Sequence, residues 1–504
     1  MRISRRDFFK FSFGSALLFT SPLTQTAKAS TQVSSLNLAN KKLKKLSYLA
    51  YKTTTIEGSF ELNHIEGKIP SDLNGSFIKI GPGTKELFGN SFNHFFDGDA
   101  YVSEFSISPT KSTLKTSFLN TPARVEEQSE GKMLYHEFGT RSPEKKNKGR
   151  KNQPNINIIA WNGTLLALSE GGHPIEIAKE NFQVKSIYNF KGSLPEKVSF
   201  TAHPKFDPDT HEGFAFGTYQ GISKALKVFK MNPKNGELIE LYSLGQKHVY
   251  MIHDMLMTKN HLIFVIPPAY YQIKDIVLDR VPLSKTLKFD RSKNTRVLVL
   301  AKDGKARPME FELPPRLVFH NGNAWEEDGM ITFQTFMTDD ESLLELINQW
   351  QSDESMSVDA PSMYEIKLDL KEARLISQEC LLRSHDFPIM NEKYLGKKNN
   401  YLFCASMGNT QDPMAFEGLT KFELSSQSSS FYPMKKNEMC GEPFFVAKKQ
   451  SFKEDDGYLA YIGYNSELDQ SFLEILDATD LKFQARIWAP CYLPLGFHGH
   501  FLAN

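Results

Sequence analysis

The chain has 504 residues, of which 40% are hydrophobic and 24% charged, with 60 basic and 59 acidic side chains. This near-balance argues against nucleic acid as a partner, because a nucleic-acid-binding surface needs an excess of Lys and Arg. The four cysteines have no CxxC spacing, so the sequence predicts neither a thiolate metal site nor a dense disulfide framework, although one disulfide bond stays open.

The first 29 residues have the parts of an export signal. A basic start precedes an apolar stretch over 8–19 and the small residues Ala27 and Ala29. Residues 4–10, SRRDFFK, have the paired arginines of a twin-arginine address, and a chance Arg-Arg pair in a basic helix is the weaker alternative. We therefore expect a twin-arginine signal peptide over 1–29, a partnership with the twin-arginine export machinery, and a periplasmic or exported protein. Removing it leaves 55 basic and 58 acidic side chains, a net charge of −3.

The rest of the chain, 30–504, is dominated by short apolar or alternating runs that predict β-strands. Asn235-Gly236 and Asp303-Gly304 tolerate positive φ and stand between such runs, which predicts hairpins. Many hairpins without a second compositional zone favour one closed all-β domain over 30–504, and a β-propeller with long insertions over one face fits best. The strand-like runs are 75–81, 157–170, 213–219, 226–241, 261–266, 296–304, 330–336, 401–406, 420–424, 457–465 and 473–478.

Two segments depart from this pattern. Residues 340–351, DESLLELINQWQ, have leucines and an isoleucine three and four apart, which predicts a helix. Residues 144–151, EKKNKGRK, form a basic run that we expect to be a solvated loop rather than a patch for anions or lipid head groups. No later stretch of 18 apolar residues predicts a membrane-spanning helix.

Four of the thirteen histidines lie in similar settings, each at the edge of an apolar run and next to a residue that turns or ends a strand. They are His203, His253, His320 and His498, separated by 50, 67 and 178 residues. Such spacing is too long for a local finger and suits ligands drawn from different blades. An all-imidazole site would select among Zn, Cu, Fe and Ni without naming one.

The segments around these histidines, in this order, resemble the carotenoid cleavage oxygenase family, which includes carotenoid, apocarotenoid and stilbene dioxygenases and the retinoid isomerase of the eye. The family's AHP, HD, FHxxNA and GFHG segments match SFTAHP, MIHDM, LVFHNGNA and LGFHGH here. LNGSFIKIGPG, HFFDGDAYV and GEPFFVAKKQ match three further family segments, so the similarity extends over nearly all of 30–504.

The resemblance implies a seven-bladed propeller beneath a dome of helices and loops, with a ferrous iron held by His203, His253, His320 and His498. A ligating imidazole needs an acceptor for its other N–H. The family supplies three glutamates, of which Glu170 and Glu442 match directly. The third stands in an EFP segment that is DFP here, so Asp386 takes its place, and its shorter side chain predicts a longer, water-mediated or backbone-compensated contact.

The implied reaction adds dioxygen, as co-substrate, across a carbon–carbon double bond of an apolar conjugated small molecule and yields two carbonyl products. Stilbene-cleaving members have a phenol-activating lysine directly before the glutamate, where this chain has Ser169. We therefore favour a carotenoid or apocarotenoid over a stilbene or other phenylpropanoid alkene. A double-bond isomerase and a non-catalytic propeller that binds an apolar ligand are the alternatives, and peripheral contact with a membrane stays open.

Three further residues have less certain roles in the sequence. Lys79 and Tyr101 depart from the family's RNGP and GDGM segments, and each is expected either to reshape a loop or to repack a strand of the first blade. His500 follows His498 by two residues and matches no ligand position, so we expect it to pack or to form a hydrogen bond near the terminus.

Overall fold

The structure is a computed structural model that describes residues 45–219, 224–351, 358–408 and 412–503. One compact unit spans Lys45–Asn504. The predicted signal peptide over 1–29 and the following residues 30–44 lie outside the described residues.

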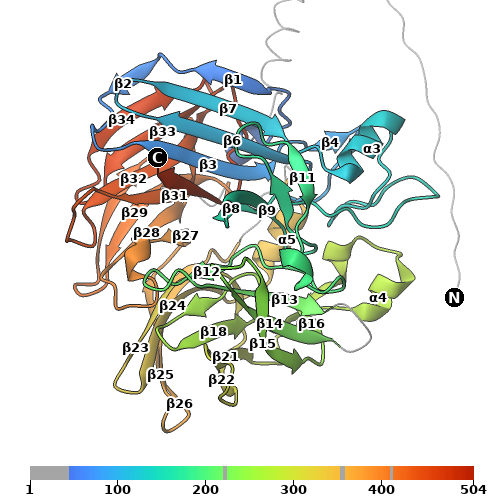
Figure 1. The fold of residues 1–504 in the computed structure, drawn as a ribbon, viewed down its shortest axis with the longest axis vertical. Coiled ribbons are helices and arrows are strands. Elements are labelled where there is room, and N and C mark those ends of the chain that lie inside the picture. Colours follow the sequence, from blue (N-terminus) through green and yellow to red (C-terminus); the bar gives the residue numbers. More distant parts are fainter. Residues whose placement is uncertain (1–44, 220–223, 352–357, 409–411, 504) are drawn as a thin grey trace, which may run out of the picture. The chain divides into compact units, whose positions relative to one another are not determined.

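The described residues form seven antiparallel blades, which confirms the predicted all-β propeller (Figure 1). Blade 1 joins both ends of the described chain, because its C-terminal strand pairs with β3, so that five strands lie in the order β1-β7-β6-β3-β35. These strands are β1 (Gly58–Glu61), β3 (Gly75–Pro82), β6 (Ala100–Ile107), β7 (Ser112–Phe118) and β35 (Gly499–Ala503).

Blades 2, 3 and 4 follow in chain order, each with four strands. Blade 2 contains β8 (Asn157–Trp161), β9 (Thr164–Leu168), β10 (Ile175–Ile177) and β11 (Val184–Ile187). Blade 3 contains β12 (Lys205–Phe206), β13 (Gly213–Tyr219), β14 (Ala225–Met231) and β15 (Leu238–Gly245). Blade 4 contains β17 (Leu256–Met257), β18 (His261–Ile266), β21 (Thr295–Ala301) and β22 (Met309–Leu313). The predicted turns at Gly236 and Gly304, with φ of 74° and 72°, connect β14 to β15 and β21 to β22.

Blades 5, 6 and 7 complete the propeller, and blades 6 and 7 are continuous through the pair Phe416 and Cys440. Blade 5 contains β23 (Leu317–Glu327), β24 (Met330–Thr338), β25 (Ser362–Asp369) and β26 (Arg374–Leu382). Blade 6 contains β27 (His385–Ile389), β28 (Tyr401–Met407), β29 (Phe416–Glu423) and β30 (Ser428–Pro433). Blade 7 contains β31 (Glu438–Ala447), β32 (Gly457–Asn465), β33 (Gln470–Asp477) and β34 (Phe483–Trp488), and β2 (Ile65–Gly67) pairs with its edge.

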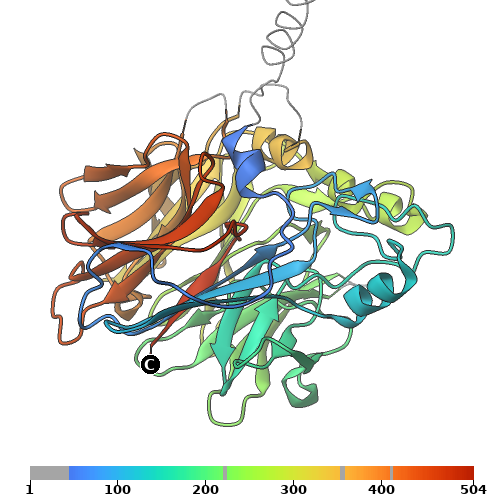
Figure 2. The same ribbon diagram turned by 90° about the horizontal axis from the view of Figure 1, so that it is seen from above.

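Insertions between the blade strands contain the remaining elements. Two small sheets are formed by β16 (Val249–Tyr250), β19 (Ala269–Tyr271) and β20 (Leu287–Phe289), and by β4 (Glu86–Leu87) and β5 (Asn90–Ser91). The helices are α2 (Leu46–Ala50), α3 (Pro122–Glu130), α4 (Ile273–Leu278), α5 (Ser342–Asn348), and the 3-10 turns η1 (Phe190–Gly192), η2 (Leu283–Thr286) and η3 (Glu392–Tyr394). Figure 2 shows α2 and α5 close together, and Tyr48 of α2 stacks on Trp350 with ring centroids 5.6 Å apart.

Alternation along the strands decides which side chains enter the core. The sequence of β7, STLKTSF, alternates between buried and half-buried residues, as period two requires.

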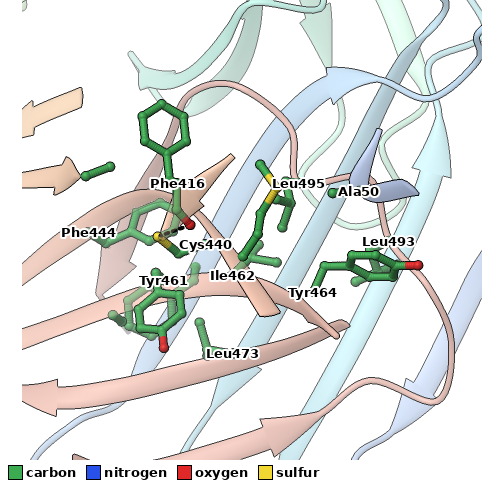
Figure 3. Close-up of a cluster of buried hydrophobic side chains, with 14 of the residues drawn as sticks. Ala50, Phe416, Cys440, Phe444, Tyr461, Ile462, Tyr464, Leu473, Leu493 and Leu495 are labelled. Carbon is green, nitrogen blue, oxygen red and sulfur yellow. Dashed lines mark hydrogen bonds between the residues drawn. The ribbon is translucent and has the colours of Figure 1, made fainter. Parts of the chain in front are cut away.

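The largest apolar cluster lies where blades 1, 6 and 7 meet, and Figure 3 shows its centre around Cys440. The Cys440 sulfur lies 3.6 Å from the carbonyl oxygen of Phe416, so the seam between two blades is closed by packed, dry side chains. All four cysteines are free, so the disulfide bond that the sequence left open does not form.

The predicted helix over 340–351 is present but shorter, as Ser342–Asn348. Helix α3 was not predicted, although Thr121 caps its N-terminus, Pro122 occupies its first turn and Gly131 ends it at a φ of 63°. These are ordinary start and stop signals. The helix was overlooked because only Glu127 along it is buried, so it lacks an apolar stripe.

The expectation that 144–151 is a solvated loop is wrong at its last residue. The side chain of Lys151 is 0% exposed, and its Nζ lies 2.5 Å from Asp99, 2.8 Å from Glu127 and 3.3 Å from Glu137. Burial opposes the charged form, but these carboxylates raise the pKa of Lys151 above its usual range. The final lysine of the run is therefore a buried counter-ion that joins the loop to blade 1.

Candidate metal centre

The four predicted histidines lie together, with ligand atoms that are all within 4.8 Å of one another. Nε2 of His253 lies 3.1 Å from Nε2 of His320, which lies 3.4 Å from Nε2 of His498. The ring of His203 lies 4.4 Å, between centroids, from both His253 and His498. Residues far apart in the chain are thus concentrated into one cluster of imidazoles.

Each blade contributes one residue to this centre, at or near one of its strands. Three of the histidines precede or lie in the first strands of blades 3, 4 and 5, and the fourth directly precedes β35 of blade 1. In blade order, the residues are His498, Glu170, His203, His253, His320, Asp386 and Glu442. The arrangement follows from the topology, because the blades of a propeller surround a common central channel.

Close backbone packing explains the glycines beside His498. A Cβ atom on Gly499 would lie 2.1 Å from the carbonyl oxygen of Ile78, and one on Gly81 would lie 2.4 Å from the Cα of Gly496. Gly496 has a φ of 70°, which residues with a Cβ rarely adopt. The turn that presents His498 can therefore approach β3 only with glycine at these positions.

A carboxylate oxygen lies beside the outer nitrogen of three of the four rings, and Asp386 and Glu442 accept hydrogen bonds there. Nδ1 of His498 lies 2.7 Å from Oε1 of Glu442, and Nδ1 of His320 lies 2.7 Å from Oδ1 of Asp386. Nδ1 of His253 contacts Oε1 of Glu170. When Nδ1–H is donated outward, a neutral ring keeps its lone pair on Nε2, which points into the cluster.

This donor set fits a metal ion. When the rings are neutral, facing Nε2 lone pairs form no hydrogen bond, so at 3.1–3.4 Å these atoms repel one another unless a proton or a metal cation lies between them. Nε2 of His203 is buried and has no hydrogen-bond partner. Imidazole donors suit Fe, Cu, Zn or Ni, and a single ion among the four Nε2 atoms would satisfy all of them.

The shorter acid Asp386 reaches His320 as closely as Glu442 reaches His498. The register of β27 against β28 shifts between Asp386 and Ile389, and Phe387 has a φ of 51°. The backbone N–H of Phe387 donates to Oδ1 of Asp386 at 2.8 Å. Of the three outcomes expected for the missing methylene, the structure has the backbone shift, and the contact is neither long nor water-mediated.

Burial sets the protonation of the cluster. It lowers the pKa of His203 well below its usual range, and it lowers the pKa of His498 to about 4 although Glu442 opposes this. Burial also acts to raise the pKa of Glu442, but His498 and Lys79 outweigh it and hold that pKa at about 2. His320 differs, since Asp386 overcomes burial and raises its pKa. At neutral pH the His498–Glu442 pair is thus a neutral imidazole beside a carboxylate, the state that metal binding requires.

The surroundings of the rings are apolar, with one more open side. Phe387 packs on His320 and His498 at centroid distances of 4.9 and 5.4 Å, and Phe319 packs on His253 at 5.5 Å. The side chain of Glu170 is 34% exposed, against 12% for the other two carboxylates. The centre is therefore most accessible from the side of Glu170.

Lys79, Tyr101 and His500 lie in three different environments. Lys79 is buried, its Nζ donates to the carbonyl oxygen of Glu442 at 2.9 Å, and burial lowers its pKa. No local pattern predicts this hydrogen bond, because the two residues are 363 positions apart. Tyr101 donates to the carbonyl oxygen of Ile56 at 2.6 Å and repacks blade 1. His500 lies in β35, away from the cluster, with Nδ1 3.9 Å from Glu392.

Fold and site together define a class: a seven-bladed β-propeller in which the blades supply four convergent imidazoles and three carboxylates behind them. The chain belongs to the RPE65 family, described as retinal pigment epithelial membrane protein, whose model matches residues 51–503. This confirms the resemblance found in the sequence. In the part of the chain that the structure describes, no helix is long and apolar enough to cross a membrane.

Curated relatives cover nearly the same length. The chain is 26% identical over 471 residues to the apocarotenoid-15,15'-oxygenase of Synechocystis sp., with 89% of this chain and 94% of the relative aligned. It is 26% identical to the carotenoid 9,10(9',10')-cleavage dioxygenase 1 of Phaseolus vulgaris, over 87% of this chain and 86% of the relative. It is also 26% identical to the isoeugenol monooxygenase of Pseudomonas putida, over 88% of this chain and 95% of the relative.

Solved structures share the fold. The cobalt-substituted Synechocystis oxygenase superposes with a TM-score of 0.85 at 24% identity, over 91% of this chain and 98% of that one. A chimera of that oxygenase with RPE65 gives the same TM-score of 0.85 at 24% identity and the same coverage.

Proposed function

We propose that this protein is a non-haem Fe(II) dioxygenase that cleaves a carbon–carbon double bond of a carotenoid or apocarotenoid into two carbonyl products. The observation on which this rests is the convergence of four imidazoles, backed by carboxylates, in a chain whose relatives include carotenoid- and apocarotenoid-cleaving oxygenases. His203, His253, His320 and His498 would hold the iron, and Glu170, Asp386 and Glu442 would orient three of those rings.

Ferrous iron, when bound, supplies the redox chemistry that allows dioxygen to react with an alkene. The side chains of the protein orient the imidazole rings and exclude water from the centre. Outward hydrogen bonds to the carboxylates hold the rings in one tautomer. Phe319 and Phe387 give the centre apolar walls, which favour a hydrocarbon over water beside it. The more open side at Glu170 is the approach for the substrate.

The residue before Glu170 favours a polyene over a phenolic alkene. Ser169 is buried, and its hydroxyl donates to Oδ1 of Asn152 at 3.1 Å. A neutral hydroxyl is far too weak a base to take a proton from a substrate phenol, as a lysine could. A polyene spreads developing charge along its own conjugation and needs no such base, so we expect long polyenes to react and hydroxystilbenes to react little.

Incubation of the iron-loaded protein with ¹⁸O₂ and a panel of carotenoids, apocarotenals, hydroxystilbenes and isoeugenol tests the proposal. Mass spectrometry should find two carbonyl fragments from a polyene, each with one ¹⁸O atom. Label in one fragment alone would contradict dioxygenation, one rearranged product without oxygen would identify an isomerase, and an unchanged bound polyene would identify a non-catalytic binding protein. Cleavage of the phenolic alkenes alone would reverse the ranking of substrates.

Cell location is a separate part of the proposal, supported by the SRRDFFK motif within 1–29. We expect export to the periplasm through the twin-arginine machinery. Replacing Arg5 and Arg6 with lysine should leave the precursor in the cytoplasm, and unchanged export would refute this route.

Contact with a membrane is supported by α4, whose Val277 and Leu278 are 76% and 44% exposed. Sedimentation with phospholipid vesicles should weaken when Val277 becomes serine.

A further inference from the structure

Three residues that adjoin different ligand histidines meet beside the metal centre. Lys205, Asp254 and Asn321 each follow a ligand histidine by one or two positions, in blades 3, 4 and 5. Nζ of Lys205 lies 2.8 Å from Oδ1 of Asp254. The backbone N–H of Asn321 donates to Oδ2 of Asp254 at 3.0 Å, and its side-chain amide lies 3.4 Å from the same oxygen.

Asp254 is the member that joins the other two. Its side chain is 3% exposed, and Oδ1 also accepts from the N–H of Met255 at 2.7 Å. A buried carboxylate is costly unless it is paired and hydrogen-bonded, and here one ammonium and two backbone N–H groups satisfy it. The contacts extend to residues 49 and 67 positions away, so local chain geometry cannot supply them.

We propose that Asp254 is a positioning residue that holds the three ligand segments of blades 3, 4 and 5 at the spacing a metal needs. The inference rests on the proposed metal centre and adds to it a residue that touches no metal. Asp254 binds the backbone N–H groups of Asn321 and Met255 and the side chain of Lys205, each within two residues of a ligand, and ligand geometry must be held to within about 0.5 Å to be productive. The fourth ligand has a different anchor, because the carbonyl oxygen of His498 accepts from the N–H of Ile80 at 3.1 Å.

The test replaces Asp254 with Asn and uses Co(II) as the probe. The amide keeps the size of the side chain, loses the ion pair with Lys205 and turns an NH₂ group toward a donor. Co(II) reports coordination through its visible absorption bands. We expect the variant to release Co(II) to a chelator about tenfold faster than the unchanged protein, the scale seen for partners of metal ligands, with shifted and broadened bands.

A matched control separates positioning from general stability. Lys421 and Asp455 form a similarly buried pair at 2.6 Å, with side chains 9% and 10% exposed, in blade 6 and the loop after β31. Asp455→Asn should lower the Tm as much as Asp254→Asn does, while its Co(II) bands and release rate match those of the unchanged protein.

The outcomes are distinct. Unchanged Co(II) bands and release in Asp254→Asn, with a lower Tm alone, would overturn the inference. If that variant does not fold, Lys205→Met tests the same link from a partner that is 19% exposed, and unchanged release there would also overturn it. If the unchanged protein shows no Co(II) bands, the metal centre itself is refuted, and this inference with it.

Discussion

Two buried polar clusters in this propeller both contain carboxylates and differ in what their atoms contact. In blade 7, Arg486 donates to Glu438 through two nitrogens at 2.7 and 2.9 Å and to Glu474 through Nε at 2.5 Å. The other oxygen of Glu474 accepts from Tyr461 at 2.5 Å and from Tyr432 at 2.9 Å. Every carboxylate oxygen of this cluster has a partner within the protein.

The metal centre is the opposite case. Three of its outer nitrogens lie beside carboxylates, but the Nε2 atoms of His253, His320 and His498 face one another at 3.1–3.4 Å, and Nε2 of His203 has no hydrogen-bond partner. The Arg486 cluster needs no ligand, because all its carboxylate oxygens have hydrogen-bond partners. The histidine cluster needs one, because buried nitrogen lone pairs that face one another have no partner. The difference predicts that variants of the first cluster affect stability and that variants of the second affect binding.

The largest effect is expected for His253→Ala. A four-imidazole site cannot spare a ligand, so iron content after anaerobic loading should fall from about one per chain to almost none, and alkene cleavage should stop. Metal analysis and product mass spectrometry measure this. His500→Ala is the control, since His500 lies outside the cluster, and it should keep both iron and activity. Stoichiometric iron in His253→Ala would show that His253 is not a metal ligand.

Arg486→Met should be the most damaging change for stability. It leaves two carboxylates buried without their cation, which costs about 3–5 kcal/mol of unfolding free energy. Denaturant unfolding measures the loss, and iron per folded chain should stay unchanged. Lys111→Met is the control, because its pair with Glu61 is 65% and 69% exposed and contributes at most about 1 kcal/mol. Loss of iron from folded Arg486→Met would remove the distinction between the clusters.

Acid should weaken the metal-free protein through the histidine cluster. The pKa of His498 is about 4 in the fold, below about 6.5 in an unfolded chain. The unfolded chain therefore takes up the proton first, and stability falls as pH drops from about 6.5 to 4, by up to about 3.5 kcal/mol at roughly 1.4 kcal/mol per pKa unit. Unfolding of the metal-free protein across this range measures the slope. The slope should be shallower in His498→Gln, and an equal slope would contradict the assignment.

The smallest effect is expected for Asp386→Glu. The backbone at Phe387 already lets the shorter acid reach His320 at 2.7 Å, so the extra methylene must push His320 or displace the N–H contact of Phe387. We expect iron affinity to fall by less than about tenfold, because the acceptor is moved rather than removed. Competition with a chelator measures it. Glu442→Asp is the matched change in the other direction, and tighter binding in Asp386→Glu would show that the shift is not an adaptation.

Much of the fold could be predicted because its causes are local. Alternation of side chains predicted β-strands, and Asn-Gly and Asp-Gly predicted turns, as found at Gly236 and Gly304. The helix α3 could also have been predicted from Thr121, Pro122 and Gly131. Lys151 could not, because its charged neighbours in sequence indicate solvent and the carboxylates that bury it come from other segments.

The sequence by itself determined the strand pattern, the all-β class and the four candidate histidines, since each depends on residue type and local spacing, and the resemblance to a known family added the three carboxylates. Tertiary structure alone decided which atoms meet. The pairing of Lys79 with Glu442, the contacts of Asp254 in three blades and the backbone shift that lets Asp386 reach His320 all depend on chain segments brought together by the closure of the propeller. Such contacts have no local signal, because closure places residues tens to hundreds of positions apart within hydrogen-bond distance.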